Sequence, residues 1–423
     1  MKRRRLAAAT ALAVGVLAVQ TGVASPVHAA APRYASTTGS GTECTSTAPC
    51  DIVTAVNQAP SSTEVIIAPG TYSLGSTGLV NSQSAVNVHG TPGQPRPVIN
   101  SNASPALSML GAGARVADLT INQNGGSFGL QVFATGILVQ RLEVHSSAAD
   151  ACAIGYSGLV RDVLCVSTAA GGVALEDSWG GGTGLLTLRN VTAVATGAGS
   201  YGIRANSTSN DTNLDVSARN VIAWGALADI GSGETGTNSE SDVILSFSNF
   251  DKIEELGGGN VTNVGSVATN QTAQPIFLDN TLFHQAWNSP TVDKGTTDVN
   301  VGTADLDGDP RRLGAATDIG ADEYDTVPPD VTLLHVPKPK VHKHKVKFIF
   351  VASEIVTFTC KVDKRKAKPC SSPLKLKLKR YGKHKITVMA RDIVGNVDPT
   401  PATYTWKLKH KHKRKHHHHQ HHH

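Results

Sequence analysis

Carboxylates that could bind a metal or act in catalysis gather in two neighbouring segments, DLDGDPRR (305–312) and DIGADEY (318–324). In the first segment Asp305, Asp307 and Asp309 alternate along the chain, as the hard oxygen ligands of calcium can do. Such a group of acids has three possible roles: a calcium loop, a catalytic cluster, or the end of a fold in which the carboxylates are structural.

The spacing does not match a known calcium loop. An EF-hand loop that began at Asp305 would require Gly at its sixth position and Glu at its twelfth, where this chain has Pro310 and Ala316. A segment that closes a fold and a calcium site, with Asp305, Asp307 and Asp309 as ligands, both stay open at this point.

A second set of charged residues could act on polysaccharides. A lyase requires a base and a cation beside a uronate carboxylate, and a hydrolase requires two carboxylates about 5–10 Å apart around the sugar bond. The candidates for these catalytic roles are Asp150, Glu176, Asp177 and Arg204.

A repeat must position these side chains. Between residues 115 and 252 a polar residue followed by apolar, variable and apolar residues recurs, as in DLTI, RLEV, DVLC, NVTA and NVIA, with a weaker copy SNF. The polar members are Asp118, Arg141, Asp162, Asn190, Asn220 and Asn249. Short strands at this period cannot bury their faces alone, so stacked rungs of a parallel β-helix are predicted, with a ladder of Asn side chains at a repeated bend. A β-propeller would require longer repeats.

A second strand in each rung defines an outward surface. We align Leu130, Ile154, Val173 and Ile203 as inward residues, which turns two outward columns toward solvent. These columns contain Gln131, Gly155, Ala174 and Arg204, and Phe133, Ser157, Glu176 and Asn206. In this register Glu176 and Arg204 lie diagonally at roughly 8 Å. The predicted glycan-binding residues on this shelf are Gln131, Phe133, Glu176, Arg204 and Asn206.

The ends of the repeat region carry the clearest resemblance to known proteins. ASTTGSGTECTSTAPCDIVTAVNQAPSSTEVIIAPGTYSL resembles the first rung of secreted right-handed β-helix proteins of the pectate-lyase-like superfamily. PIFLDN, NSPTVDKG and DLDGDPRRLGAATDIGADEY are similar to the C-terminal module often called choice-of-anchor Q. The resemblance covers about residues 34–325 and implies that the last segment folds over the final rung. The Asp-Asp, Gly-His-Gly and Arg-Ile-Lys motifs of polygalacturonases are missing, as is a clear pectate-lyase signature.

After TVPPD (326–330) the composition changes, as at a domain boundary. The segments VKFIFV, IVTFTCK, LKLKLK, HKITVMAR and TYTWKLK alternate as strands of a small β-sandwich do. YGKHKITVMARDIVGNVDPTPATYTW is similar to bacterial immunoglobulin-like modules with the pattern GxHxxxVxAxDxxGN. The fold class is therefore all-β, a right-handed parallel β-helix followed by an Ig-like β-sandwich.

Charge divides the chain in the same place. Residues 31–330 contain 12 Lys and Arg against 29 Asp and Glu, whereas residues 331–423 contain 23 against 4. The basic part could hold anionic glycans or wall polymers, and it has no feature that would recognise specific nucleic acid. The tail KHKHKRKHHHHQHHH could bind transition metals, could be partly a tag, or could be a disordered cationic segment, which we favour.

The N-terminus predicts export. A basic start, an apolar run and small residues before position 30 form a signal peptide, and no later run is long enough to span a bilayer. Six cysteines in an exported chain predict three local disulfides, Cys44–Cys50, Cys152–Cys165 and Cys360–Cys370, although the middle pair could also be two buried thiols. The expected divisions are 1–29 (signal peptide), 30–327 (β-helix, with its cap at about 275–325), 328–409 (Ig-like domain) and 410–423 (tail).

Two classes of function fit these features. The one we favour is a secreted or cell-surface, monomeric scaffold that binds polysaccharide and is held at anionic surfaces by its basic domain. The alternative is a lyase or glycoside hydrolase of acidic polysaccharides. No cofactor is expected beyond a possible calcium ion.

Overall fold

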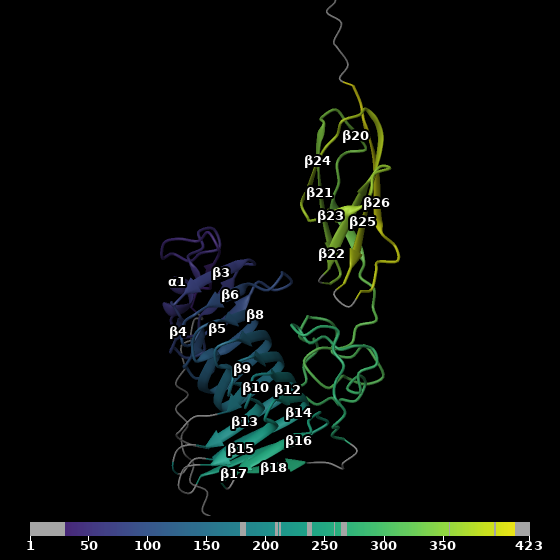
Figure 1. The fold of residues 1–423 in the computed structure, drawn as a ribbon. Helices are drawn as coiled ribbons and strands as arrows, with labels where there is room; N and C mark the ends of the chain where they lie inside the picture. Colours follow the sequence, from purple (N-terminus) through teal and green to yellow (C-terminus); the bar gives the residue numbers. More distant parts are fainter. Residues whose placement is uncertain are drawn as a thin grey trace, which may run out of the picture.

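The computed structural model describes residues 30–177, 183–207, 210, 213–234, 239–257, 259–263, 269–354, 356–392 and 395–410. The predicted signal peptide and most of the predicted tail lie outside these ranges. A β-solenoid of about seven turns is followed by an irregular segment and by a smaller body of two sheets (Figure 1). The predicted fold class is thus confirmed, as a solenoid followed by small β-sheets.

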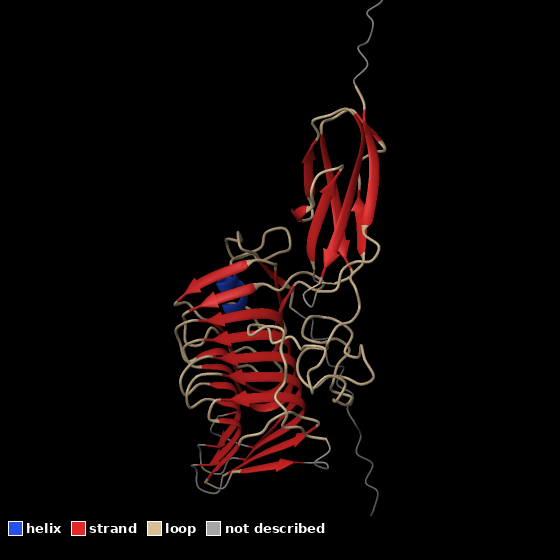
Figure 2. Cartoon of the chain, turned by 45° about the vertical axis from the view of Figure 1, so that its right-hand side comes forward, coloured by secondary structure: helices blue, strands red, loops and turns tan. Residues whose placement is uncertain are grey.

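The solenoid begins with a short helix. Helix α1 (Ile52–Asn57) has Asp51 as its N-cap, whose carboxylate accepts a hydrogen bond from the Thr54 amide at 2.9 Å. The buried Ile52, Ala55 and Val56 of α1 cover the end of the first rung (Figure 2). The solenoid strands are β1 (Arg33–Ala35), β2 (Glu64–Ile67), β3 (Thr71–Gly75), β4 (Leu79–Asn81), β5 (Asn87–Gly90), β6 (Val98–Ser101), β7 (Leu107–Met109), β8 (Arg115–Gln123), β9 (Phe128–Ser146), β10 (Asp150–Ser167), β11 (Val173–Asp177), β12 (Thr183–Ala195), β13 (Tyr201–Ser207), β14 (Asn213–Gly225), β15 (Ala228–Glu234), β16 (Glu240–Ser246), β17 (Ile253–Leu256) and β18 (Asn260–Asn263).

Parallel pairing stacks equivalent residues of successive rungs. One inward column, made of residues that are 0% exposed, consists of Leu107, Leu130, Cys152, Leu175, Ile203 and Ile230. The alignment predicted from the sequence was wrong in two rungs, because Cys152 and Leu175 occupy the positions expected for Ile154 and Val173. A shift of two residues keeps every side chain on its own face, so alternation alone cannot detect it.

The repeated polar residues stand at a tight bend. Asp118, Arg141, Asp162, Asn190 and Asn220 all have φ between 49° and 56°, in the left-handed region that Asn and Asp tolerate best. The amides form the predicted ladder, since Asn190 Nδ2 donates to Asp162 Oδ1 and Asn220 Nδ2 donates to Asn190 Oδ1, each at 2.9 Å. The recurrence of polar residues therefore reflects a backbone requirement.

The sixth position of this column was predicted wrongly. Asn249 pairs with Ile222, two residues beyond the column, whereas the register Arg219↔Ser246 places Phe247 opposite Asn220. Phe247 has φ of 48° and so makes the left-handed bend without a short polar side chain. The same bend therefore occurs in a rung where the sequence has no short polar residue to indicate it.

The cap segment, defined as the described residues between 269 and 325, lies along the side of the solenoid (Figures 1 and 2). Asn190 Nδ2 donates to the Val301 carbonyl at 2.9 Å, and Asn220 Nδ2 donates to the Thr296 carbonyl at 2.7 Å. Leu306, Ala321 and Phe283 of the cap pack on Leu164, Val166 and Val194 of the solenoid. The expectation that this segment folds over the final rung is therefore corrected, because most of its contacts run along one flank.

The second body contains two facing sheets, β19-β21-β24 and β20-β26-β25-β22-β23. The rings of Phe348 on β21 and Trp406 on β26 pack 5.1 Å apart between centroids, and both side chains are buried. All five strands predicted here are present, and β19, β20 and β23 are additional. The strands are β19 (Val331–His335), β20 (Lys340–Val341), β21 (Lys345–Ala352), β22 (Thr357–Val362), β23 (Lys368–Cys370), β24 (Leu374–Lys377), β25 (Gly382–Arg391) and β26 (Ala402–Leu408).

Three disulfides join the predicted cysteine pairs, with S–S distances of 1.99, 2.01 and 2.07 Å in chain order. Cys152 and Cys165 are both 0% exposed, so the middle pair is a bond inside the solenoid core. Three disulfides and no described free cysteine indicate an oxidising, extracytoplasmic location. Within the described ranges, no helix is long and apolar enough to cross a membrane.

The amide ladder leads to a first prediction. Asn190→Ala places Ala in the left-handed region and removes the hydrogen bonds of Asn190 to Asp162, Val301 and Asn220, so the free energy of unfolding should fall by about 2–4 kcal/mol in urea titrations. The matched control is Asn122→Ala, which removes one partly exposed hydrogen bond to Asn100 at a position without positive φ and should cost about 1 kcal/mol. Equal losses in the two variants would contradict a special role for the bend.

Candidate functional site

The predicted shelf residues meet more closely than the sequence suggested. In the observed register Glu176 lies directly opposite Arg204, in a column that also contains Gln131, Gly231 and Glu254. Arg204 Nε donates to Glu176 Oε1 at 3.0 Å, and Nη2 of Arg204 donates to the same oxygen. The expected diagonal separation of Glu176 and Arg204 is thus replaced by an ion pair between adjacent rungs.

Aromatic and acidic neighbours hold this ion pair. The Arg204 guanidinium lies 5.1 Å from the centre of the Tyr201 ring, and the Tyr201 hydroxyl donates to Glu254. Burial, followed by the bond to Glu254, raises the pKa of Tyr201 to about 12. Arg204 is consequently occupied on two sides, which makes it a poor candidate for a base that removes a proton from a substrate.

Carboxyls are crowded beside the ion pair. The Asp150 carboxylate accepts the Val173 amide at 2.7 Å, and the charge of Glu176 acts on it. Burial, together with repulsion from Glu176, raises the pKa of Asp150 to about 6. Asp177 is 0% exposed, and burial and then Glu176 and Asp215 raise its pKa well above the usual range. Asp177 therefore retains its proton at neutral pH, whereas Asp150 loses its proton near pH 6.

The other predicted shelf residues differ in exposure. Gln131 and Asn206 are half-buried on the outward side, and Gln131 accepts a hydrogen bond from Ser108 at 2.7 Å. Phe133 is only 9% exposed, so it offers little surface on which a sugar could stack. The accessible part of the shelf is hence polar, and its roles in binding or catalysis stay predictions.

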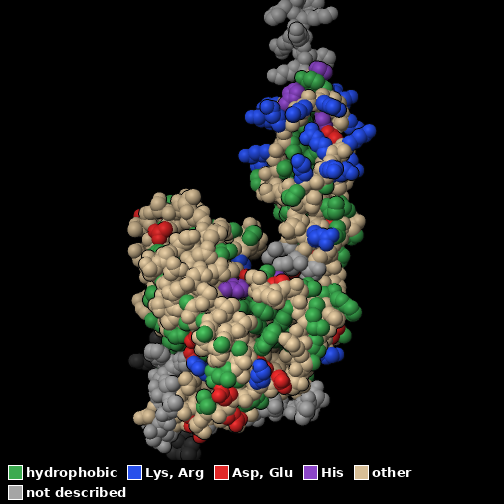
Figure 3. All heavy atoms as spheres, in the orientation of Figure 1, with side chains coloured by type: hydrophobic (Ala, Val, Ile, Leu, Met, Phe, Trp, Pro, Cys, Tyr) green, Lys and Arg blue, Asp and Glu red, His purple; other side chains and the backbone are tan. Residues whose placement is uncertain are grey.

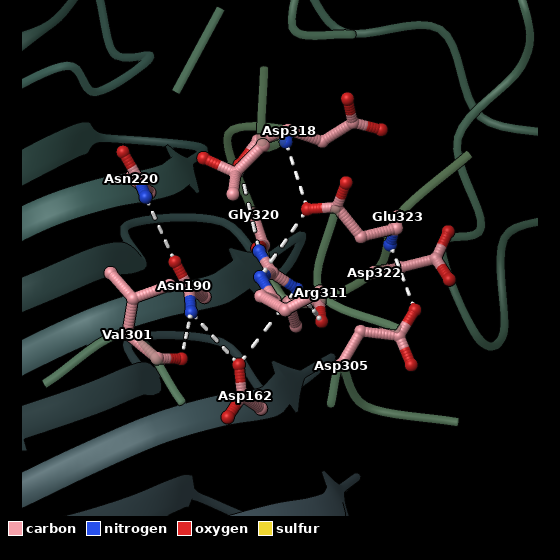
Figure 4. Close-up of polar contacts among 12 residues, drawn as sticks. Asp162, Asn190, Asn220, Val301, Asp305, Arg311, Asp318, Gly320, Asp322 and Glu323 are labelled. Carbon is pink, nitrogen blue, oxygen red and sulfur yellow. Dashed lines mark hydrogen bonds and ion pairs between the residues drawn. The ribbon is translucent and has the colours of Figure 1, made fainter. Parts of the chain in front are cut away.

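The second acidic region is organised around a buried arginine (Figure 4). Arg311 is 3% exposed and donates to the carbonyls of Ala321 at 2.8 Å and Gly320 at 2.5 Å. Its guanidinium also lies 3.8 Å from Asp162 of the solenoid and 3.3 Å from Glu323 of the cap. Arg311 therefore joins the segment 318–324 to the column of left-handed bends.

The carboxylates of this region mostly bind backbone amides. Asp305 accepts the amides of Asp307, Gly308 and Asp309 at 2.8–3.0 Å, and its other oxygen accepts the amide of Glu323 at 3.0 Å. In the same way Asp318 accepts the amides of Asp293 and Tyr324, each at 2.7 Å. These bonds support the structural interpretation of the two acidic segments. The carboxylates accept hydrogen bonds from backbone amides that have no partner in a helix or strand.

The three aspartates that could have bound one calcium ion do not converge. Asp305 is used by its own turn, as described above. Asp307 accepts from His284 at 2.9 Å and lies 3.7 Å from Arg96, whereas Asp309 groups with Asp325 and Glu354. The sequence therefore identified acids that belong to three separate environments.

The environment of Asp307 contains its own cations. His284 is 2% exposed and lies between Asp279 and Asp307, with both distances at 2.9 Å. Burial alone would lower the pKa of His284, but Asp307, Asp322 and Asp279 raise it to about 10. His284 is thus an imidazolium at neutral pH, and with Arg96 it balances the acids around it.

The environment of Asp309 differs. Carboxylate oxygens of Asp309, Asp325 and Glu354 lie within 4.8 Å of one another, and the charge of Asp392 acts on all three. Burial and then mutual repulsion raise the pKa of Asp309 to about 6 and that of Glu354 to about 8. Among the described residues no basic side chain forms an ion pair with this group. Sequence reasoning missed Asp325, Glu354 and Asp392, which are far apart in the chain.

Lysines form an opposite feature on the sandwich. Strands β21 and β24 place Lys345 opposite Lys377 and Lys347 opposite Lys375, and all four side chains are exposed. We call these four residues the lysine face. Like charges directly across a strand pair destabilise a sheet, so the face carries positive charge at a cost in stability. Figure 3 shows Lys and Arg gathered on the sandwich, whereas few lie on the visible side of the solenoid.

Comparisons with known proteins do not assign this chain to a family. No family model matches the sequence, and no curated protein matches it. The crystal structure of pectate lyase Pel9A is similar, with a TM-score of 0.38 and 13% identity over 70% of this chain and 96% of that chain. The assignments of the cap to an anchor module and of the sandwich to an immunoglobulin-like family stay predictions.

The buried arginine gives a second prediction. Arg311→Met should lower the free energy of unfolding by about 3–5 kcal/mol, because Asp162, Glu323 and two carbonyls lose their buried partner. Arg312→Met is the matched control, since Arg312 is exposed and bonds only the Ala315 carbonyl among the described residues. The control should change the free energy by about 0.5 kcal/mol or less in urea unfolding. Similar effects of the two changes would show that Arg311 is not the anchor of the cap.

Asp150 gives a third prediction, on pH. Its pKa of about 6 means that the folded state holds the proton more tightly than the unfolded state, so ionisation removes stability as the pH rises from about 4 through 6. Asp150→Asn keeps an acceptor for Val173 and should therefore stabilise the protein at about pH 8 by up to about 3 kcal/mol, and not at about pH 3.5. Thermal unfolding at both pH values measures this, with exposed Asp251→Asn as the control. A gain that is equal at both pH values would refute the assignment.

Proposed function

We propose that this protein is an extracytoplasmic scaffold that binds polysaccharide and is held on an anionic polymer by the lysine face of its sandwich. The disulfides and the predicted signal peptide support an extracellular location. The solenoid supplies a rigid body, and the sandwich supplies the contact that fixes it to a surface. The partner is recognised by charge along a chain and not by base sequence.

The lysine face is the observation that carries this proposal. Two directly opposed Lys pairs repel each other in the free protein, and an anionic polymer would remove that repulsion on binding. In the described part of the sandwich the only ion pair is His384–Asp363, so the lysines are not neutralised by the protein's own acids. The acidic solenoid cannot attract the same polymer, which favours attachment through the sandwich alone.

The shelf supports a second, weaker contact with glycan. Gln131 on β9, and Arg204 and Asn206 on β13, present polar atoms on the outward side of two rungs, where neutral sugars could accept and donate hydrogen bonds. The repeat spacing of about 4.8 Å between rungs aligns such groups along the rod. This arrangement suits an extended chain more than a compact ligand.

The alternative function, a lyase or glycoside hydrolase, requires groups that the shelf does not leave free. Asp150 already accepts the Val173 amide, and Glu176 accepts two hydrogen bonds from Arg204, whereas hydrolysis of a glycoside requires two carboxyls that are free to flank the sugar bond. Arg204 is paired with Glu176. Incubation with acidic and neutral polysaccharides, with calcium or EDTA, tests this alternative directly. New unsaturated products or reducing ends that vanish in Glu176→Gln would establish an enzyme and overturn the scaffold.

Our fourth prediction tests attachment. Replacing Lys345, Lys347, Lys375 and Lys377 together with Gln should weaken binding to polygalacturonate roughly a hundredfold or more at low salt, since each Lys near an anionic surface contributes about 1 kcal/mol. The variant should stay folded because the change relieves repulsion. Binding is measured by biolayer interferometry at several salt concentrations, and affinity of the wild-type protein should fall as salt increases.

A control variant removes the same charge elsewhere. Its four substitutions to Gln are at exposed basic residues of the solenoid and cap, Arg115, Lys252, Lys294 and Arg312. This variant should retain binding within about threefold, because residues more than a Debye length of about 10 Å from the polymer contribute little. Equal losses in the two variants, or no binding by the wild-type protein to any anionic polymer, would contradict attachment through the lysine face.

A further inference from the structure

Three carboxyls from separate loops meet where the cap joins the sandwich, and the charge of a fourth acts on all three. Asp309 and Asp325 belong to the cap, Glu354 follows β21, and Asp392 follows β25. We call these four residues the junction cluster. The two bodies also touch directly at this place, since Asn396 Nδ2 donates to the Asp325 carbonyl at 3.1 Å.

The spacing of the cluster fits a cation of definite size. One carboxylate oxygen from each of Asp309, Asp325 and Glu354 lies within 4.8 Å of the other two. Two oxygens on opposite sides of a calcium ion, at about 2.4 Å each, are also about 4.8 Å apart. The three oxygens can thus surround one calcium ion without a large movement of the backbone.

Asp392 supplies an independent indication of a ligand. It is 5% exposed, and its Oδ1 accepts the amides of Gly395 and Asn396 at 2.6 and 2.7 Å. Its Oδ2 is buried and has no hydrogen-bond partner among the described residues. A buried carboxylate oxygen without a partner costs free energy, and the charge of Asp392 acts on Asp309, Asp325 and Glu354.

The comparison with the other acidic group strengthens this point. Around His284 the carboxyls of Asp279 and Asp307 are balanced by the imidazolium and by Arg96. In the described structure the junction cluster has no such partner, although Asp325 and Asp392 are buried and Asp309 and Glu354 are half-buried. A purely carboxylate set selects a hard divalent cation, because zinc and copper prefer imidazole and thiolate.

We propose that the junction cluster is a calcium site that joins the cap to the sandwich, with Asp309, Asp325, Glu354 and Asp392 as its ligands. Calcium accepts six to eight oxygens in flexible geometry, and water or backbone carbonyls complete its shell. The ion would fix the sandwich relative to the solenoid. This site does not depend on polysaccharide binding, so either proposal can fail alone.

Glu354→Gln and Asp392→Asn, made singly in the full chain, test the proposal. For the wild-type protein we expect calcium to bind with one ion per chain in isothermal titration calorimetry and to raise the Tm by about 5 °C or more at 1 mM. Each variant should bind calcium at least about tenfold more weakly. In EDTA each variant should have a Tm at or above that of the wild type, because one repelling charge is gone.

Glu43→Gln is the matched control, since Glu43 is exposed on the first loop of the solenoid and should leave calcium binding unchanged. Circular dichroism confirms folding, and the predicted Tm in EDTA separates loss of the ion from a general structural defect. The proposal is wrong if the wild-type protein binds no calcium, or if Glu354→Gln and Asp392→Asn bind it as the wild type does. A variant with lower Tm in EDTA would assign its carboxyl a structural role and also contradict the site.

Discussion

The left-handed bend in each rung is the constraint on which the rest of the structure depends. Asp162, Asn190 and Asn220 turn the chain there, and their side chains satisfy one another along the rod. The same amides also donate outward to carbonyls of the cap. A single column therefore shapes the solenoid and provides the polar flank on which an irregular segment can lie without unsatisfied backbone groups.

Buried charged side chains are compensated in three different ways in this structure. Arg311 is surrounded by carbonyls and two acids, which makes it part of the packing between cap and solenoid. His284 takes up a proton and becomes a cation between two aspartates. The junction cluster has acids from two bodies and no basic partner in the described structure. The first two arrangements need only the chain itself, whereas the third gains from an added ion.

The sequence predicted features that repeat and missed those that depend on long-range contacts. Left-handed bends favour Asn and Asp, so five of the six polar positions were located correctly, whereas Phe247 gave no such signal. The alternation of apolar and polar residues showed which side chains of the shelf face outward. It could not show which residues of neighbouring rungs pair, because Val173 and Leu175 lie on the same face of the strand and a shift of two residues leaves the pattern unchanged. Nothing local to Glu354 or Asp392 indicates that they meet, since the sandwich and cap bring them together.

The position of the cap along the flank determines how the protein bears load. A pull on the sandwich enters the cap near Asp325, where Asn396 is bonded. From there it passes to three different rungs, which bear Glu143, Asp162 and Asn220 and which the cap contacts directly or through Arg96. The force therefore acts on several rungs at the same time, parallel to the contact between cap and solenoid. It does not act on the terminal rung alone. A protein attached through the lysine face, as we propose, would carry drag on the solenoid through this flank.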